Sequence, residues 1–145
     1  MLKGIPPILS PELLKVLMEM GHSDDLLICD GNYPRNGSPE RCIRMDGHGV
    51  PEILEAIMQF FPLDKSVESA ITYMAVPEGN PYVPEVWEKY KEIFERNATD
   101  GENTTPRKVK RFDFYEEGKK CYACIATSES ALFANVILKK GVIKL

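Results

Sequence analysis

Histidine is scarce in this chain of 145 residues, which contains only His22 and His48. So few histidines restrict the acid–base chemistry open to the protein, and they lie too far apart in sequence to build a zinc site with the cysteines. The sequence also lacks the GxxxxGKS/T and GxGxxG motifs that hold nucleotide phosphates, and the GxSxG nucleophile elbow of serine hydrolases. These absences leave no recognisable metal, nucleotide or serine-hydrolase signature.

Long apolar runs are missing as well. No stretch approaches the roughly 18 apolar residues of a membrane span, and the segment before Leu14 carries prolines and a lysine where a signal peptide needs a continuous apolar core. We therefore expect a cytoplasmic protein with no membrane contact. The net charge of −4 attracts polyanions weakly, so we also expect no nucleic-acid partner.

What the sequence does contain is the length and composition of one folded domain. A chain of this length, 43% apolar, can bury a proper core without disulfide or metal staples. Strand patterns alternate with helix patterns, which predicts an α/β layered fold for residues 1–145. The expected helices are 11–20, 52–61 and 85–97, and the expected strands are 26–29, 42–45, 71–76, 123–127 and 136–138.

The first helix has the clearest boundaries. Ser10 can accept a hydrogen bond from the free amides of the first turn, Pro11 suits the first helical position, and Gly21 suits a left-handed end. The apolar stripe that we expect to face the core is Leu13, Leu14, Leu17 and Met18.

Residues 111–115 fit a strand or a helix equally well. In both structures, positions i and i+4 share a face, so Arg111 and Tyr115 are expected to point the same way. They offer a cation and a phenol side by side.

Cys121 and Cys124 have the spacing of a redox pair. Such a motif requires a strand-to-helix junction that lowers the pKa of the first thiol, but here it runs directly into a strand pattern at 125–127. Residues three apart in a strand face opposite sides, so the sulfurs would diverge. We interpret the cysteines as core and strand residues, with thiol redox chemistry as a remote alternative.

His22 is the better candidate for proton transfer. It follows Gly21 at the end of the first helix, and Asp24 and Asp25 come just after it. A helix C-terminus and nearby carboxylates both favour a protonated imidazole, which suits a group that gives and recovers a proton at neutral pH. A plain surface histidine at a helix end fits the pattern equally well.

Asp30 closes the first strand, a place where α/β proteins put ligand groups, although a cap for the following turn fits better. Asn135 offers an amide just before the last strand, and 46–49 reads as a plain turn. None of these residues identifies a substrate.

Four blocks of sequence resemble the fucose mutarotase and ribose pyranase family, in order and at the family's spacing. They are SPELL through MGH to Asp30, IRMDG at 43–47, RFDFYE at 111–116 and NVILKKGV at 135–142. The RFDFYE block points to the fucose branch, because a histidine replaces the arginine in the ribose branch. The resemblance implies a cofactor-independent isomerase that interconverts the α and β anomers of a free sugar, L-fucose, in a decameric ring with active sites between subunits.

The resemblance also implies roles for individual residues. His22 falls on the family's proton donor, Tyr115 on a residue that is catalytic in mammalian-type members, and the other matched positions bind the sugar. These substrate-binding positions are Asp30, Asp64, Met74, Arg111, Phe133 and Asn135, and no metal site is implied. Phe133 and Ala134 stand where the family usually has Tyr-Gly, so a hydroxyl is lost at Phe133 while backbone contacts can survive.

The implied reaction suits these residue types. Anomerisation needs a proton delivered to the ring oxygen while another leaves the anomeric hydroxyl, which a histidine can assist. Three alternatives remain open: a mutarotase acting on D-ribose or another pentose, a non-catalytic monosaccharide-binding protein, and the thiol redox protein.

Overall fold

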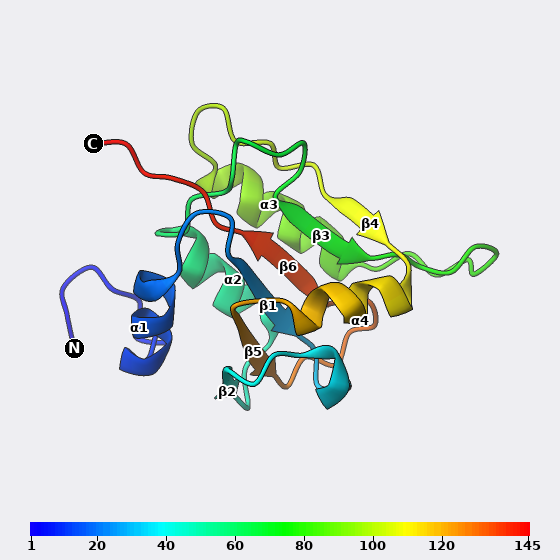
Figure 1. Cartoon of the computed structure of the whole chain (residues 1–145). Helices are drawn as coiled ribbons and strands as arrows, with labels where there is room; N and C mark the ends of the chain where they lie inside the picture. The colour runs from blue at the N-terminus through cyan, green and yellow to red at the C-terminus, as the bar shows by residue number, and fades with distance from the viewer.

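The computed structural model describes residues 1–145 and has one six-stranded sheet with helices on both of its faces (Figure 1). In chain order the elements are α1 (Pro11–Glu19), β1 (Asp25–Cys29), η1 (Arg35–Gly37), β2 (Cys42–Met45), α2 (Val50–Met58), β3 (Ile71–Met74), α3 (Val86–Asn97), β4 (Arg107–Val109), α4 (Arg111–Lys119), β5 (Ala123–Thr127) and β6 (Val136–Lys139). The prediction of an α/β fold is confirmed.

The sheet is mixed, with the strand order β2-β5-β1-β6-β3-β4. Strands β2, β5 and β1 run parallel, as do β3 and β4, while β6 is antiparallel to both β1 and β3. As a result, the C-terminal ends of β1, β3, β4 and β5 and the N-terminal end of β6 meet at one edge of the sheet. The opposite strand ends meet at the other edge.

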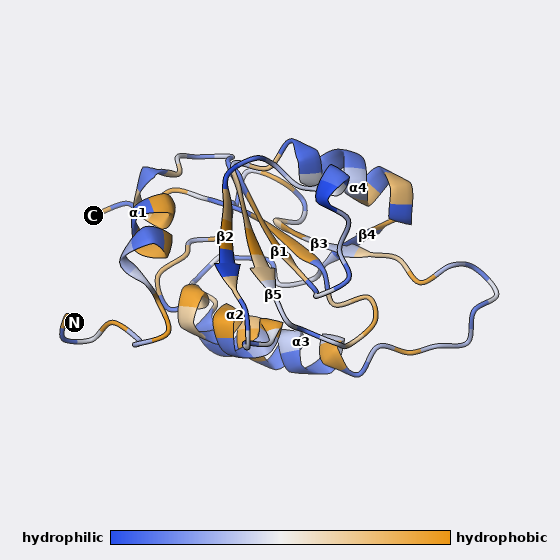
Figure 2. Ribbon diagram, turned by 90° about the horizontal axis from the view of Figure 1, so that it is seen from below, coloured by the Kyte–Doolittle hydropathy of each residue, from blue (hydrophilic) through white to orange (hydrophobic).

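Alternate side chains of the central strands serve different cores, because successive residues of a strand face opposite sides. Leu26 and Ile28 of β1 join the larger core under α1, α2 and α3, whereas Leu27 and Cys29 join a smaller core under α4. Figure 2 shows α2 and α3 below the sheet and α4 above it. Both faces are covered, which explains the continuous apolar runs in the strand sequences.

Two local expectations about α1 need correction, one open alternative is decided, and one strand was not expected. In α1, Ser10 caps the helix as predicted, but Val16 is buried while Met18 is 82% exposed, so the apolar stripe was placed too far around the helix. Gly21 is not left-handed; Ser23 is, with φ +70°. Residues 111–115 are helical, and β4 was missed because an exposed edge strand of basic residues carries no apolar signal.

Three of the four cysteines are buried and Cys42 packs against the core, as expected, and all four are free. The divergence predicted for Cys121 and Cys124 is wrong, because Cys121 precedes β5 and both side chains pack in the core under α4. The close thiol pair is instead Cys29 and Cys124, with their sulfurs 3.4 Å apart. Burial raises the pKa of Cys121 well above its usual range, the reverse of what a reactive thiol needs.

No helix combines the length and the apolar character that crossing a bilayer requires.

Candidate active site

The predicted site residues lie at two opposite edges of the sheet. We call the edge before β1 and β3 the histidine end; it holds His22 and Asp64. We call the other edge the arginine end, and it holds the remaining predicted residues, which are Asp30, Met74, Arg111, Tyr115, Phe133 and Asn135. The five-residue strand β1 separates His22 from Asp30, and at about 3.3 Å per residue it alone spans about 16 Å. One copy of the chain therefore does not bring the whole predicted set together.

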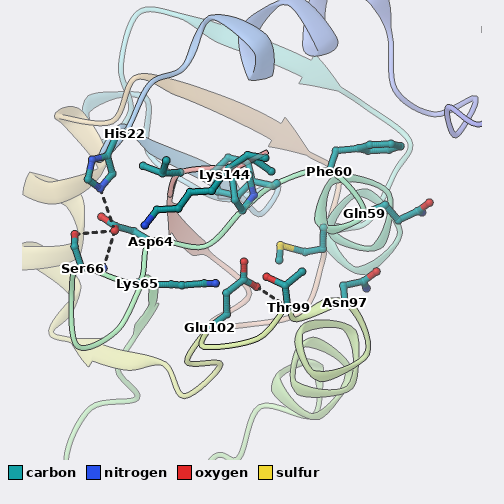
Figure 3. A pocket seen from close by; sticks show the side chains of 15 residues that line it. His22, Gln59, Phe60, Asp64, Lys65, Ser66, Asn97, Thr99, Glu102 and Lys144 are labelled. Atoms are coloured by element: carbon teal, nitrogen blue, oxygen red, sulfur yellow. Dashed lines mark hydrogen bonds and ion pairs between the residues drawn. The ribbon is translucent and has the colours of Figure 1, made fainter.

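At the histidine end, His22 is paired with Asp64. Its Nε2 lies 3.2 Å from Asp64 Oδ1, the imidazole is 48% exposed and the carboxylate only 2% exposed (Figure 3). Because an ionised carboxylate only accepts, this contact assigns the proton of the neutral ring to Nε2. Nδ1 is then the basic nitrogen, free to take up a proton from a bound molecule.

Asp64 is held ionised by its local donors. Burial alone would raise the pKa of Asp64, but the Ser66 amide at 2.9 Å, the Ser66 hydroxyl at 2.7 Å and His22 all donate to Oδ1 and lower that pKa below its usual range. The hydroxyl of Ser23 adds a longer contact to Oδ2. A buried anion kept in this way fixes the orientation and the tautomer of the imidazole.

The partner of His22 is thus not the one that the sequence suggested. Asp24 accepts from the Gly21 amide at 2.7 Å, and Asp25 pairs with Lys139. The end of α1 is occupied as well, because the Lys140 ammonium reaches the carbonyls of Leu17 and Met20. A lysine, rather than the imidazole, neutralises the negative end of the helix dipole.

His22 and Asp64 open onto a cavity of about 560 Å³. In Figure 3 they lie on one side of it, across from Gln59, Phe60 and Asn97. Its rim is partly apolar and exposed, with Phe60, Val142 and Ile143 among the lining residues.

At the arginine end, Asp30 and Asn135 are joined by two hydrogen bonds. Asp30 directly follows β1, and Asn135 directly precedes β6. The buried amide of Asn135 accepts from the Asp30 backbone N–H at 2.8 Å and donates to Asp30 Oδ2 at 3.1 Å. The other carboxylate oxygen accepts from the Asn32 amide, as the turn-cap interpretation predicted. Burial raises the pKa of Asp30, although these donors oppose the shift.

Arg111 and Tyr115 share one face of α4, as predicted. Arg111 Nε donates to Tyr115 Oη at 3.1 Å, so the phenol keeps its own O–H to donate. Both line a cleft of about 410 Å³ together with Asn32 and Phe112. The cleft therefore offers a cation and a hydroxyl to a polar ligand.

Met74 and Phe133 supply an apolar element beside this polar group. Met74 is buried in the core under α4, and Phe133 and Tyr115 pack against the same core. Phe133 has a left-handed backbone, with φ +57°, in the turn where the sequence departs from Tyr-Gly.

Two residues of the histidine end escaped the sequence analysis. Ser66 had a visible signal, since an aspartate that accepts the amide two residues later is a common turn, and Asp64-Lys65-Ser66 fits that pattern. Lys140 had none, because it acts on the end of a helix more than a hundred residues earlier.

Together, the mixed sheet and its two polar ends define an α/β protein equipped to bind a polar small molecule and to move protons on it. The model of the RbsD / FucU transport protein family matches residues 3–143, and this chain belongs to that family.

The chain is similar over its length to proteins of known activity. It is 47% identical to the fucose mutarotase of Danio rerio, with 98% of this chain and 94% of the relative covered. It is 42% identical to an L-fucose mutarotase of Actinobacillus pleuropneumoniae, with 98% and 97% covered. Its fold matches the crystal structure of the Streptococcus pneumoniae fucose mutarotase in complex with L-fucose, with a TM-score of 0.90, 45% identity and coverage of 99% and 100%.

Proposed function

We propose that this chain is an L-fucose mutarotase, an isomerase that interconverts the α and β anomers of the free sugar without a cofactor, and that residues 1–145 form its one mutarotase domain. The observation that carries the proposal is the His22–Asp64 pair in a chain that matches fucose mutarotases from end to end. The L-fucose in the crystal structure of the pneumococcal relative supports the choice of sugar.

The chemistry follows from the hydrogen-bond arrangement. In ring opening, the ring oxygen takes up a proton, the bond between C1 and the ring oxygen breaks, and the anomeric hydroxyl loses its proton to become the aldehyde oxygen. Rotation about C1–C2 and the reverse transfers close the ring on the other face. Protonated His22 can give the proton from Nδ1 and regain it on closure, while Asp64 stabilises the imidazolium. Spontaneous mutarotation is already measurable, so an acid–base factor of about 10²–10⁴ suffices.

The residues of the arginine end would hold the sugar. The Tyr115 hydroxyl, which accepts a hydrogen bond from Arg111, would exchange a proton with the substrate as the second catalytic group. Asp30 and Asn135 can bind sugar hydroxyls through the carboxylate and amide lone pairs that their mutual contacts leave free. Met74 and Phe133 give the apolar 6-methyl group of L-fucose a place to pack.

A complete site would need two copies of the chain, with the histidine end of one facing the arginine end of the next. Head-to-tail contacts of this kind generate rings when the rotation closes, and the family resemblance implies a ring of ten. Exposed apolar side chains at both ends support such a contact: Ile143 is 64% exposed at the histidine end and Phe112 is 71% exposed at the arginine end.

The proposal is tested by NMR magnetisation exchange between the anomeric protons of L-fucose. We expect the wild type to accelerate exchange over buffer and His22→Ala to lose about 10²-fold or more of that acceleration. His48→Ala is the matched control, because the side chain of the second histidine hydrogen-bonds only Glu52 and lies just after the turn that the sequence suggested. If the wild type did not accelerate the exchange, the proposal of an enzyme would be overturned, and the non-catalytic sugar-binding protein would be the remaining alternative.

Parallel runs with D-ribose and D-galactose rank the substrates. Faster exchange with D-ribose than with L-fucose would favour the pentose alternative. Action in the cytoplasm is part of the proposal and agrees with four free cysteines, three of them buried.

A further inference from the structure

The turn that carries Phe133 and Asn135 is held from the far side of the sheet. Trp87 Nε1 of α3 donates to the Phe133 carbonyl at 2.9 Å, and the Tyr90 hydroxyl, one helical turn later, donates to the Ala134 carbonyl at 2.7 Å. Two consecutive carbonyls thus accept hydrogen bonds from side chains of α3, a helix that packs in the larger core.

The turn needs such support. A left-handed non-glycine residue costs about 1–2 kcal/mol, and Phe133 is one. The Ala134 carbonyl is bonded inside the core, since Tyr90 and Ala134 are both fully buried. Without the phenol, this carbonyl would be left without its partner in a place that water does not reach, which is a costly state for a backbone group.

The two donors are themselves rigid. The Trp87 indole stacks on Tyr73 with ring centroids 5.1 Å apart, and the Lys108 ammonium lies over the Trp87 ring at 4.8 Å from its centre. Tyr90 packs edge-on against Tyr73. Neither donor can follow a shift of the turn without disturbing this aromatic group.

The position of the turn is passed on to Asp30. Asn135 follows Ala134 directly, and its amide binds both the backbone and the carboxylate of Asp30. A displacement of the Ala134 carbonyl therefore moves the amide and the carboxylate together.

We propose that Trp87 and Tyr90 are positioning residues of the arginine end: by fixing the carbonyls of Phe133 and Ala134, they set the place of Asn135 and Asp30 against the substrate. This inference rests on the proposed function. Misplacing binding groups by a fraction of an ångström weakens sugar binding and catalysis without any loss of chemistry at His22.

Tyr90→Phe and Trp87→Phe test the proposal, with Tyr73→Phe as the matched control because it removes a phenol from the same aromatic group without removing a hydrogen bond to the turn. We expect Tyr90→Phe to raise the L-fucose concentration for half-maximal exchange about tenfold, Trp87→Phe to raise it about threefold, and Tyr73→Phe to leave it within about twofold. Loss of folded protein would lower the maximal rate at an unchanged half-saturation concentration.

Amide hydrogen exchange gives a readout that does not depend on activity. In Tyr90→Phe we expect faster exchange confined to peptides covering 30–33 and 131–136, with β5 as protected as in the wild type. The inference would be overturned if Tyr90→Phe and Trp87→Phe both kept the wild-type half-saturation concentration for L-fucose. It would also be overturned if amide hydrogen exchange became faster evenly over the whole sheet. Failure of the wild type to accelerate the interconversion of the anomers would overturn the proposed function instead. The pattern of amide hydrogen exchange would still show whether the two side chains position the turn.

Discussion

The histidine end and the arginine end each place an aspartate beside a nitrogen-bearing side chain, but they hold the two carboxylates in opposite ways. Asp64 sits in a loop whose own amide and hydroxyl donors, together with His22, lower the pKa of its carboxyl. Asp30 follows a buried strand, where burial outweighs its donors and raises the pKa of its carboxyl. The difference teaches that the pKa of each carboxyl is set by the balance between burial, which raises it, and hydrogen-bond donors, which lower it.

The two ends also differ in what they lack. The histidine end has the His22–Asp64 pair beside a wide cavity that no arginine or tyrosine lines, whereas the arginine end has a cation, a phenol, an amide and a carboxylate but no histidine. Each end supplies what the other needs, which is why the proposed site spans two copies.

A loss comparable to that of His22→Ala is expected at Asp64. Asp64→Asn keeps the shape of the side chain but removes the charge that stabilises the imidazolium, so we expect L-fucose anomer exchange to fall about a hundredfold. Asp24→Asn, the sequence neighbour of His22, should stay within about twofold, since an amide oxygen can still accept from Gly21. A loss in Asp24→Asn and none in Asp64→Asn would show that the wrong carboxylate has been paired with His22.

The next effect tests whether the ends combine between copies. His22→Ala and Arg111→Ala are each expected to be nearly inactive, but co-expressed chains should recover about one site in four, because random neighbours then supply one native end each. Co-expression of His22→Ala with Asp64→Asn, two changes at the same end, should recover nothing. The site would lie within one copy if co-expressed His22→Ala and Arg111→Ala chains stayed inactive in oligomers that mass spectrometry shows to contain both chains.

The smallest effect is the pH dependence of stability. The carboxyl of Asp64 has a folded pKa below the ordinary aspartate value of about 3.9, so its contribution is complete above about pH 5 and is lost as the pH falls through 3.9 towards the folded value. The carboxyl of Asp30 has a raised folded pKa, so its ionisation costs stability above that pKa, and the cost is relieved as the pH falls from the folded pKa to the ordinary value of about 3.9.

Denaturant unfolding between pH 6 and 3 measures both contributions. We expect the free energy of unfolding to fall less steeply on acidification in Asp64→Asn than in the wild type, and more steeply in Asp30→Asn. Equal slopes in the two variants would contradict the opposite pKa shifts of the two ends.

Much of the fold could be predicted from local pattern. Strands with continuous apolar runs, such as β1 and β5, were found because both faces of the sheet are covered, and α1 was found because Ser10 and Pro11 signal a helix start. β4 escaped because its residues are exposed, and the buried face of α1 was misjudged because apolar residues occur on more than one side of that helix.

The candidate site was predicted less evenly. The shared face of Arg111 and Tyr115 followed from helical spacing alone. The pairing of His22 with Asp64 joins residues 42 positions apart, and no local pattern indicates it. The separation of His22 from Asp30 is predictable from the sequence, because the whole predicted strand at 26–29 lies between them.

By itself, the sequence determined the succession of strands and helices, the caps and turns, and the residues available for proton transfer, because these depend on near neighbours and on side-chain chemistry. Only the tertiary structure decided which residues meet. The antiparallel placement of β6 brings Asn135 to Asp30, the loop before β3 brings Asp64 to His22, and Lys140 occupies the end of α1. Such contacts depend on how the strands are ordered in the sheet, which no short stretch of sequence encodes.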